Sequence, residues 1–448
     1  EKALRKVFQS QFAFITATYH PSQLPNHLPG KSSNECWAFQ QLCKDLEAQG
    51  LQSCDPRVVI TIMDDDSYMH PKYFEALTYY FLAAGPSCRY MRIWQPPICH
   101  FKNFLRQPVL VQISSLFSTL SELAGLANPL DCHVTYSTYS ISLVLATAVG
   151  GWDPDFLAED WHMFAKCAVK SEGRLRCVPI FLPVLNYTPE EDTYWQTLCS
   201  RWTQAKRHAL GVSEVVYVLS ASFLAFLELP SWRTALSFSW RLSPVLAKFT
   251  QTHFVNGMAG VWNVMAQLVI HIFLLGSWCS LESTERCSRW DAGSEQVLRN
   301  SMLVYLQQRA TALMALSSIF CGGLGAIYFH MVKDGVEGNV QGHWKTRSLP
   351  LMWLIIEIEV SVFGLAQSFI FGAMPLWIAC LRIIGGIRFT HSVVGMALPL
   401  VIGQHVRANL SFSWRCSSFS WPRVLDIAGL AVLLALVHRA VPRDSRAT

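Results

Sequence analysis

The distribution of apolar residues divides the chain into two parts. Before about residue 210 these residues come in short runs that charged residues interrupt, whereas after it they come in runs of membrane length. In the first part, strand-like runs alternate with helical patterns, which is typical of an α/β sheet domain. We therefore expect a sheet domain over residues 1–210, followed by transmembrane and interfacial helices over residues 211–448.

The pattern predicts the main elements of both parts. Strands are expected at 12–19, 58–63, 89–94, 134–144 and 174–182, and helices at 34–50, 71–84, 110–126, 161–170 and from about 196. Apolar runs at 212–229, 254–278, 310–332, 349–380 and 424–437 indicate membrane spans, and 232–249 indicates an amphipathic surface helix. Within the fourth run, Glu357 and Glu359 either line a path for an acceptor or pair with Arg382 or Arg388.

Composition agrees with a membrane protein and excludes some classes. Of all residues, 51% are hydrophobic and 15% are charged, whereas soluble domains have about 25% charged residues. The net charge is +5, but no dense basic run with interleaved aromatic residues is present, so we expect no nucleic acid partner. The 14 cysteines form no CxxC pair, which indicates reduced thiols in a cytosol-facing protein rather than zinc sites or disulfides.

Three acids, Asp64, Asp65 and Asp66, directly follow the predicted strand 58–63. Adjacent carboxylates repel one another unless they lie in water or bind a cation. Mg²⁺ and Mn²⁺ take oxygen ligands and usually share them with substrate phosphates. The stretch therefore indicates a metal site at the end of a strand, with a solvated acidic turn as the alternative.

A second acid pair, Glu159 and Asp160, precedes the predicted helix 161–170. Acids at a helix start are also favoured by the helix dipole, so capping is the alternative interpretation. Turns that leave parallel strands of one sheet fall on the same edge. We therefore expect this pair to converge with the three aspartates. Lys31, just before a predicted helix, meets phosphate in one interpretation and lies free on the surface in the other.

Four segments resemble, in order, the motifs of inverting family-2 glycosyltransferases. GKSSNECWA from residue 30 resembles GKxxNxNxA, DDD at 64–66 resembles DxD, AED at 158–160 resembles TED, and QTLCSRW at 196–202 resembles (Q/R)xxRW. Cys36 and Ala158 replace an Asn and a Thr of these motifs, and the spacer before Arg201 is longer. The chain is thus similar to the group that includes cellulose, chitin and hyaluronan synthases and ceramide glucosyltransferase.

The resemblance implies a GT-A-like nucleotide-sugar-binding domain with a multi-pass membrane region. It also implies that the family's first nucleotide-binding strands precede residue 1, so that the chain is truncated at its N-terminus. The site residues that it implies fall into three groups. They are Asp160 as general base with Glu159 beside it, Asp64 and Asp66 as ligands of Mg²⁺ or Mn²⁺, and Lys31, Asp64, Arg201, Trp202 and Gln196 as substrate-binding residues.

We expect a membrane-bound enzyme with its catalytic head in the cytosol. It transfers a sugar with inversion from a nucleotide diphosphate sugar, expected to be a UDP-sugar, to a hydroxyl of a glycan or lipid acceptor, and the lipid bilayer is a further partner. One alternative is a catalytically inactive multi-pass scaffold or transport component with a degenerate head. Another is a metal-dependent nucleotidyltransferase, which uses similar acids but leaves the Arg201–Trp202 pair unexplained.

Overall fold

The computed structural model describes residues 30–50, 54–156, 158–256 and 366–385, together with short stretches and single positions among residues 6–27 and 258–364. The predicted span at 424–437, Glu357, Glu359 and Arg388 lie outside the described residues. The same holds for most of the spans at 254–278 and 310–332 and for part of the span at 349–380.

Within these residues, short strands form two mixed sheets. The strands are β1 (Val59–Ile62), β2 (Tyr68–Met69), β3 (Arg92–Gln95), β4 (Ile98–Cys99), β5 (Tyr139–Ser142), β6 (Arg176–Pro179) and β7 (Val184–Leu185). The larger sheet has the order β1-β5-β3-β6, in which β5 is antiparallel to both neighbours and β3 is parallel to β6. In the smaller sheet, β7 lies between β2 and β4. The predicted α/β class is confirmed.

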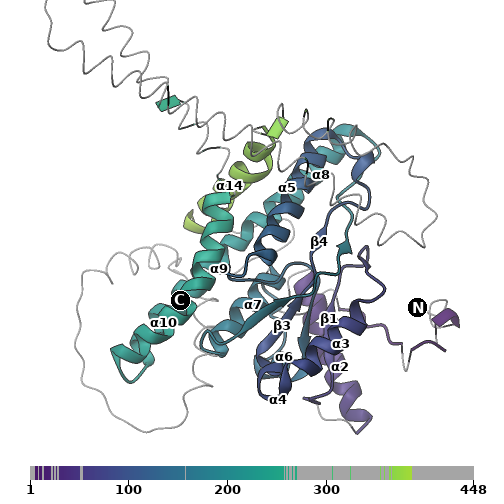
Figure 1. Ribbon diagram of the computed structural model, residues 1–448, viewed down its shortest axis with the longest axis vertical. Coiled ribbons are helices and arrows are strands. Elements are labelled where there is room, and N and C mark those ends of the chain that lie inside the picture. Colours follow the sequence, from purple (N-terminus) through teal and green to yellow (C-terminus); the bar gives the residue numbers. More distant parts are fainter. Residues whose placement is uncertain are drawn as a thin grey trace, which may run out of the picture.

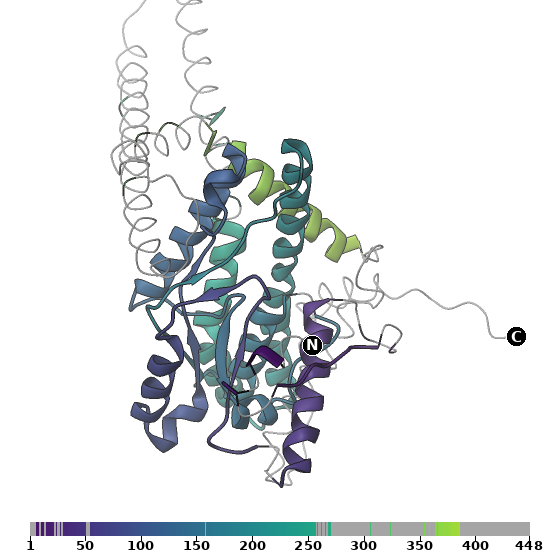
Figure 2. The same cartoon turned by 90° about the vertical axis from the view of Figure 1, so that its right-hand side faces the viewer.

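Helices surround the sheets and extend the domain in one direction. They are α2 (Lys31–Ala48), α3 (Tyr73–Ala83), α4 (Gly85–Cys88), α5 (Val109–Ala127), α6 (Leu143–Ala148), α7 (Glu159–Lys170), α8 (Tyr194–Ala209), α9 (Ser213–Glu228), α10 (Trp232–Thr250) and α14 (Met374–Gly385). In Figure 1 the strands lie at the centre, and α5, α8 and α14 rise above them. Figure 2 shows α2 and α3 on opposite sides of the larger sheet.

The alternation of side chains along the strands explains this layering. On β1, Val59 packs against the cluster of α3, whereas Ile60 and Ile62 pack on the opposite face. On β3, Trp94 joins the α3 side and Ile93 the other, and both are fully buried. Because successive side chains of a strand point to opposite faces, both faces of the sheet need a cover of helices.

Several predicted boundaries are wrong. The described residues 12 and 15–19 form no strand, and the strand expected at 134–144 is reduced to β5 and followed by α6. The residues before β5 form a turn because side chains of other elements hydrogen-bond to the backbone of these residues. The amide of Tyr136, for example, donates to Gln95 Oε1 (2.8 Å). Helices α2 and α7 begin earlier than predicted, at Lys31 and Glu159, so both candidate site residues open a helix.

The core continues past residue 210, where we placed a domain boundary. One buried cluster includes Phe164 of α7, Tyr217 of α9, Phe238 of α10 and Leu376 of α14. Among the described residues, two helical stretches are long and apolar enough to cross a membrane, Val109–Ala127 and Tyr194–Glu228. Half of the apolar window in the second is buried inside the protein. The division at residue 210 stays a prediction, because packing is continuous across it.

A buried ionic network joins α7 to α9. His162 of α7 donates from Nε2 to Asp153 Oδ2 and from Nδ1 to Glu214 Oε2 of α9, both at 2.9 Å. Lys166 Nζ lies 2.7 Å from Asp153 Oδ1. The imidazole stacks on Phe156 with 3.4 Å between ring centroids. Burial opposes the imidazolium, but Glu214 and Asp153 outweigh it and raise the pKa of His162 to about 9.

This network predicts a pH dependence of stability. The pKa of His162 is 6.5 in the unfolded chain and about 9 in the folded one. Its stabilisation is therefore complete below pH 6.5 and lost as pH rises through 9. We expect the free energy of unfolding to fall by up to about 3 kcal/mol over this range.

Thermal unfolding measured against pH checks this expectation. His162→Gln removes the cation, so the slope between pH 6.5 and 9 should disappear, whereas His70→Gln, outside the network, should keep it. A slope that His162→Gln leaves intact contradicts the assignment. Since the substitution leaves two carboxylates buried, it also lowers the melting temperature at neutral pH. Titration of the His162 ring in the wild-type protein by NMR gives the same pKa without a substitution.

Candidate functional site

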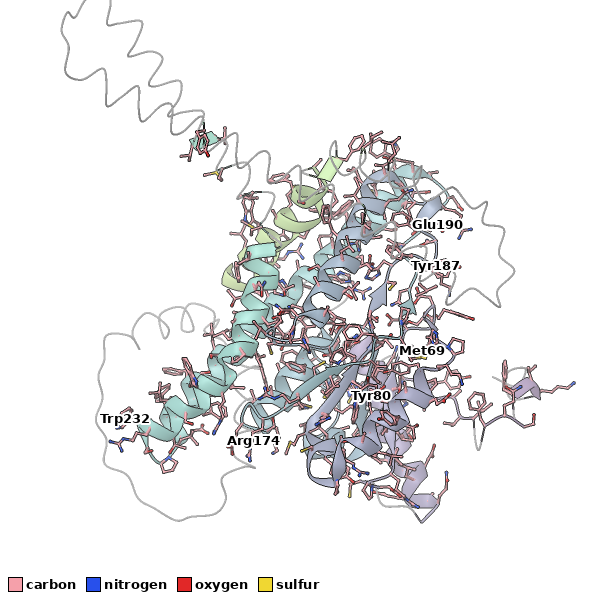
Figure 3. All side chains as sticks on the ribbon, viewed as in Figure 1. Met69, Tyr80, Arg174, Tyr187, Glu190 and Trp232 are labelled. Carbon is pink, nitrogen blue, oxygen red and sulfur yellow. The ribbon has the colours of Figure 1, made fainter. Side chains whose placement is uncertain are left out.

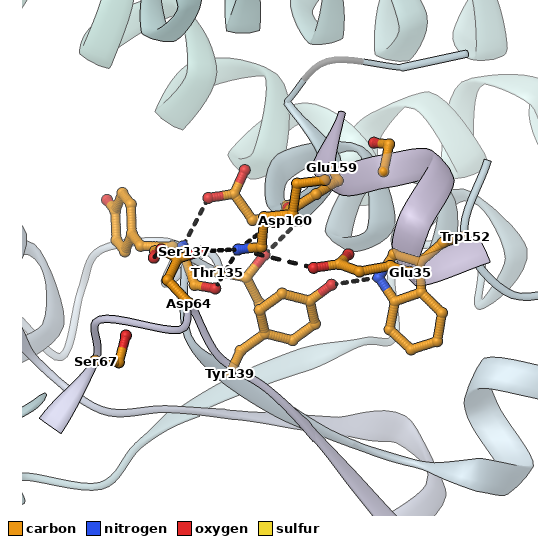
Figure 4. Close-up of polar contacts among 12 residues, drawn as sticks. Glu35, Asp64, Ser67, Thr135, Ser137, Tyr139, Trp152, Glu159 and Asp160 are labelled. Carbon is orange, nitrogen blue, oxygen red and sulfur yellow. Dashed lines mark hydrogen bonds and ion pairs between the residues drawn. The ribbon is translucent and has the colours of Figure 1, made fainter. Parts of the chain in front are cut away.

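The ammonium group of Lys31 lies at the centre of the candidate site, and Figure 4 shows its partners Glu35, Asp64, Ser137 and Glu159. Its Nζ is 2.8 Å from Asp64 Oδ1 and 2.6 Å from Glu159 Oε1. It also donates to the carbonyl oxygen of Ser137 (2.9 Å) and lies 3.8 Å from Glu35 Oε1. The predicted convergence of the two acid sites is therefore confirmed, and the same cation contacts both.

The reason for this convergence differs from the one we expected. We expected exits from parallel strands, but β1 and β5 are antiparallel, with Ile62 paired to Tyr139. The carboxyl end of β1 consequently lies beside the amino end of β5. Asp64 follows the first end by two residues, and Ser137 precedes the second by two. The parallel-edge argument is wrong for this sheet, and antiparallel pairing brings the residues together instead.

Asp160, in the first turn of α7, is held by the turn before β5. Its Oδ2 accepts a hydrogen bond from the Ser137 amide (2.7 Å), and its Oδ1 accepts one from the Trp161 amide (2.8 Å). Thr135 Oγ1 donates to its carbonyl oxygen (2.6 Å). Burial raises the pKa of Asp160, and Lys31 and the two amides oppose the rise. The residue as a whole is partly exposed, and the two amides orient its carboxylate, as a general base requires.

The two glutamates of the site are more buried and lack full pairing. Glu159 is 6% exposed, and among the described residues its Oε2 has no hydrogen-bond partner, nor has Oε2 of Glu35. Burial and the neighbouring acids raise the pKa of Glu35 to about 8 and that of Glu159 well above its usual range. Burial also acts on Asp64, but Lys31 and Ser137 outweigh it and lower its pKa. The cluster thus holds extra protons at neutral pH.

Asp66 faces a different space, a cavity of about 620 Å³ beside β7. The residues lining it are Asp66, Tyr187, Thr188, Pro189, Glu190, Glu191, Asp192 and Gln204; Figure 3 labels Tyr187 and Glu190 at its side of the molecule. Burial, and then the charge of Asp64, raises the pKa of Asp66. In the part of the chain that the structure describes, Asp66 makes no ion pair, and the backbone amide of Tyr187 hydrogen-bonds to its carboxylate and opposes the rise in pKa.

The donor set can be tested for a divalent metal. Among the described residues, no cluster of three or more acidic, His or Cys side chains has the arrangement of a metal site. Mg²⁺ in nucleotide sites is usually held by one or two carboxylates together with substrate phosphates, so a smaller protein share fits this ion. Asp66 fits that role, whereas both carboxylate oxygens of Asp64 are engaged by Lys31 and Ser137.

The structure does not bring two residues of the (Q/R)xxRW-like segment to the acids. Arg201 is buried and donates from Nε and Nη2 to Ser114 Oγ of α5 (3.2 and 2.6 Å). Gln196 is exposed, and its side-chain oxygen accepts a hydrogen bond from the hydroxyl of Thr193, which caps α8. Arg201 thus fixes α8 to α5, and Gln196 belongs to the start of α8.

Trp202 lies half-buried on α8, and its indole has the ammonium of Lys206 5.8 Å from the ring centroid. The two residues stand at i and i+4 along the helix, and their contact is a cation–π interaction. The residue as a whole stays partly exposed. Trp202 is therefore available for an apolar sugar face, although no described contact joins it to the acids.

Three further residues belong to the site but gave no clear signal in the sequence. Glu35 lies one helical turn after Lys31, inside a segment that we read for its Lys and Asn only. Ser137 lies in a stretch that we predicted as strand. Arg207 of α8 is close enough for its charge to lower the pKa of Asp64. The sequence offers one signal for Glu35: it stands four residues after Lys31, and residues at this spacing share one face of a helix.

Comparison with known families adds to this geometry. Residues 59–281 match the family described as glycosyl transferase family group 2. The match begins at β1 and includes the three aspartates, Ser137, the acid pair of α7 and all of α8, whereas Lys31 precedes it. No curated protein and no solved structure matches the chain. The chain carries a family 2 glycosyltransferase domain over residues 59–281, and the protein is a glycosyltransferase.

Proposed function

We propose that the protein transfers a sugar from a nucleotide diphosphate sugar, a UDP-sugar, to the hydroxyl of a glycan or lipid acceptor with inversion. The observation that carries the proposal is the contact of one cation, Lys31, with Asp64 on the β1 side and Glu159 on the α7 side. The cavity lined by Asp66, two residues after Asp64, adds space for a substrate. Together they offer a base, acidic ligands and room at one edge of the sheet.

Asp160 acts as the general base. Its carboxylate takes the proton of the acceptor hydroxyl, the oxygen attacks the anomeric carbon of the donor, and the bond from that carbon to the diphosphate oxygen breaks. The electron pair of the broken bond leaves on the nucleoside diphosphate. Because attack occurs opposite to the leaving group, the configuration inverts. Glu159, buried against Lys31, supports this arrangement electrostatically rather than by contacting the acceptor.

Negative charge on the departing diphosphate needs a positive partner. Asp66 would hold Mg²⁺ or Mn²⁺, with Asp64 as the second acid of the motif, and a bound ion neutralises the diphosphate. Arg207 of α8 supplies a positive charge near Asp64. Lys31 keeps Asp64 ionised and placed. We assign Arg201 and Gln196 to positioning α8, since their contacts lie within the protein.

The acceptor side is assigned to aromatic surfaces. Trp202 has a flat apolar face suited to a pyranose ring, and Tyr187 lines the cavity with the ammonium of Lys102 4.5 Å from its ring centroid. Membrane attachment through residues 211–448, with the head in the cytosol, is supported by the candidate span Tyr194–Glu228, which extends past residue 211, whereas the span Val109–Ala127 lies within the head. It also agrees with the basic residues Lys206, Arg207 and His208 that end α8.

Asp160→Asn tests the base. We expect the transfer rate to fall about 100-fold or more, as loss of a general base does. The measurement is release of UDP from UDP-sugars by membranes that contain the full-length protein. Asp45→Asn, an acid of α2 away from the site, is the control and should keep the rate. A wild-type protein that releases no more UDP than Asp160→Asn favours the inactive scaffold instead.

Asp66→Asn tests the metal assignment. Removal of divalent ions with a chelator should abolish transfer by the wild-type protein, and added Mn²⁺ should restore it. Because Asp66 is the proposed ligand, the substitution should raise the Mn²⁺ concentration for half-maximal activity by about tenfold. The exposed neighbour Asp65→Asn is the matched control. Equal Mn²⁺ requirements for Asp66→Asn and Asp65→Asn contradict a ligand role for Asp66.

A further inference from the structure

Ser137 contacts three residues of the site, each with a different polar group. Its amide donates to Asp160 Oδ2 (2.7 Å), and its carbonyl accepts from Lys31 Nζ (2.9 Å). Its hydroxyl donates to Asp64 Oδ2 and accepts from Asn186 Nδ2 (3.3 Å). The one residue thus joins the proposed base to the acid of the metal motif and to the central lysine (Figure 4).

The backbone of Ser137 is in an unfavourable conformation. Its φ is +31°, a region that L residues other than glycine rarely adopt and that costs about 1–3 kcal/mol. Such a conformation persists when the surroundings fix it. The neighbouring Tyr136 amide is held by Gln95, which is fully buried, and Thr135 Oγ1 is held by the Asp160 carbonyl. Both sides of the turn are therefore anchored to other elements, which leaves the geometry of Ser137 fixed.

The hydroxyl of Ser137 is also held from the second sheet. Asn186 follows β7, is 4% exposed, and accepts a hydrogen bond from Ser67 Oγ (2.9 Å) while its Nδ2 donates to Ser137. The hydroxyl therefore has its acceptor role filled and directs its proton to Asp64. A serine at this position supplies an oriented hydrogen bond to a carboxylate, which is stronger than one between neutral groups.

We propose that Ser137 is a positioning residue that sets the placement of the general base relative to the donor-binding acid. The inference rests on the proposed function. The hydroxyl orients Asp64, on the side of the nucleotide diphosphate, and the strained backbone aims the amide at Asp160, on the side of the acceptor. Substitution can separate these two roles of Ser137, because the side chain orients Asp64 and the backbone amide orients Asp160.

Ser137→Gly and Ser137→Ala separate them. Glycine adopts positive φ without strain, so Ser137→Gly loses the hydroxyl and keeps the turn. Alanine retains the strain but loses the hydroxyl that ties residue 137 to Asp64 and Asn186, so this anchor no longer opposes relaxation of the turn and the amide moves away from Asp160. With UDP-sugar and Mn²⁺ we expect Ser137→Gly to raise the donor KM by about tenfold with kcat nearly unchanged. Ser137→Ala should raise KM equally and also lower kcat by about tenfold.

Thr78→Ala, which removes an exposed hydroxyl bonded to a helix carbonyl in α3, is the matched control and should keep both parameters. Wild-type donor KM and kcat in Ser137→Gly overturn the inference. So does an equal loss of kcat in both variants with KM unchanged and matching losses of melting temperature, which is a purely structural effect. If the wild-type protein releases UDP and both Ser137 variants have its donor KM and kcat, the inference fails but the proposed function stands. If the wild-type protein releases no more UDP than Asp160→Asn, the proposed function fails, and the inference that rests on it fails too.

Discussion

The site depends on one electrostatic constraint, a single ammonium group among four carboxyl groups. Lys31 contacts Asp64 and Glu159 directly and lies 3.8 Å from Glu35, while Asp160 is one residue further along α7. One positive charge cannot balance four negative ones in a partly buried place, and burial together with the neighbouring acids raises the pKa of Glu35 and of Glu159, which favours their protonated forms. The remaining excess of negative charge favours a substrate that arrives with a cation over a bare diphosphate.

The antiparallel pairing of β1 and β5 brings the charged residues of the site together. It places the end of β1 next to the start of β5, and the two strands therefore deliver Asp64 and Ser137 to each other. The smaller sheet adds Asn186 from the far side of the same point. Helices α2 and α7 both begin there, and their amino ends favour nearby anionic groups. Strands β1 and β5, helices α2 and α7 and the residue after β7 thus meet at the charged groups of the site.

The sequence predicted the acids and the elements that carry them, since a buried strand that ends in three aspartates and a helix that starts with two acids are strong local patterns. It did not predict Ser137, because the role of this residue comes from its φ and from partners 23 to 106 positions away. It did not predict the contact of Arg201 with Ser114, because a motif specifies residue types and spacing, whereas the direction of the side chain depends on α5, where Ser114 stands in no motif. Nor did it predict Arg207, because a basic residue beside an apolar run has the same appearance at a membrane flank as it has near a binding site.

The network around His162 ties helix α7, which carries the proposed base, to the apolar helix α9. Asp160 and His162 lie two residues apart on α7, and the second is bonded to Glu214 at the start of α9. Because both groups are buried, moving α9 relative to α7 separates an imidazolium from its carboxylate in a poorly solvated place, which is costly. The orientation of the proposed base is therefore coupled to the position of a helix that is apolar enough to enter a membrane. A division at residue 210 separates the chemistry from the apolar helices in sequence, but the packing makes them one mechanical unit.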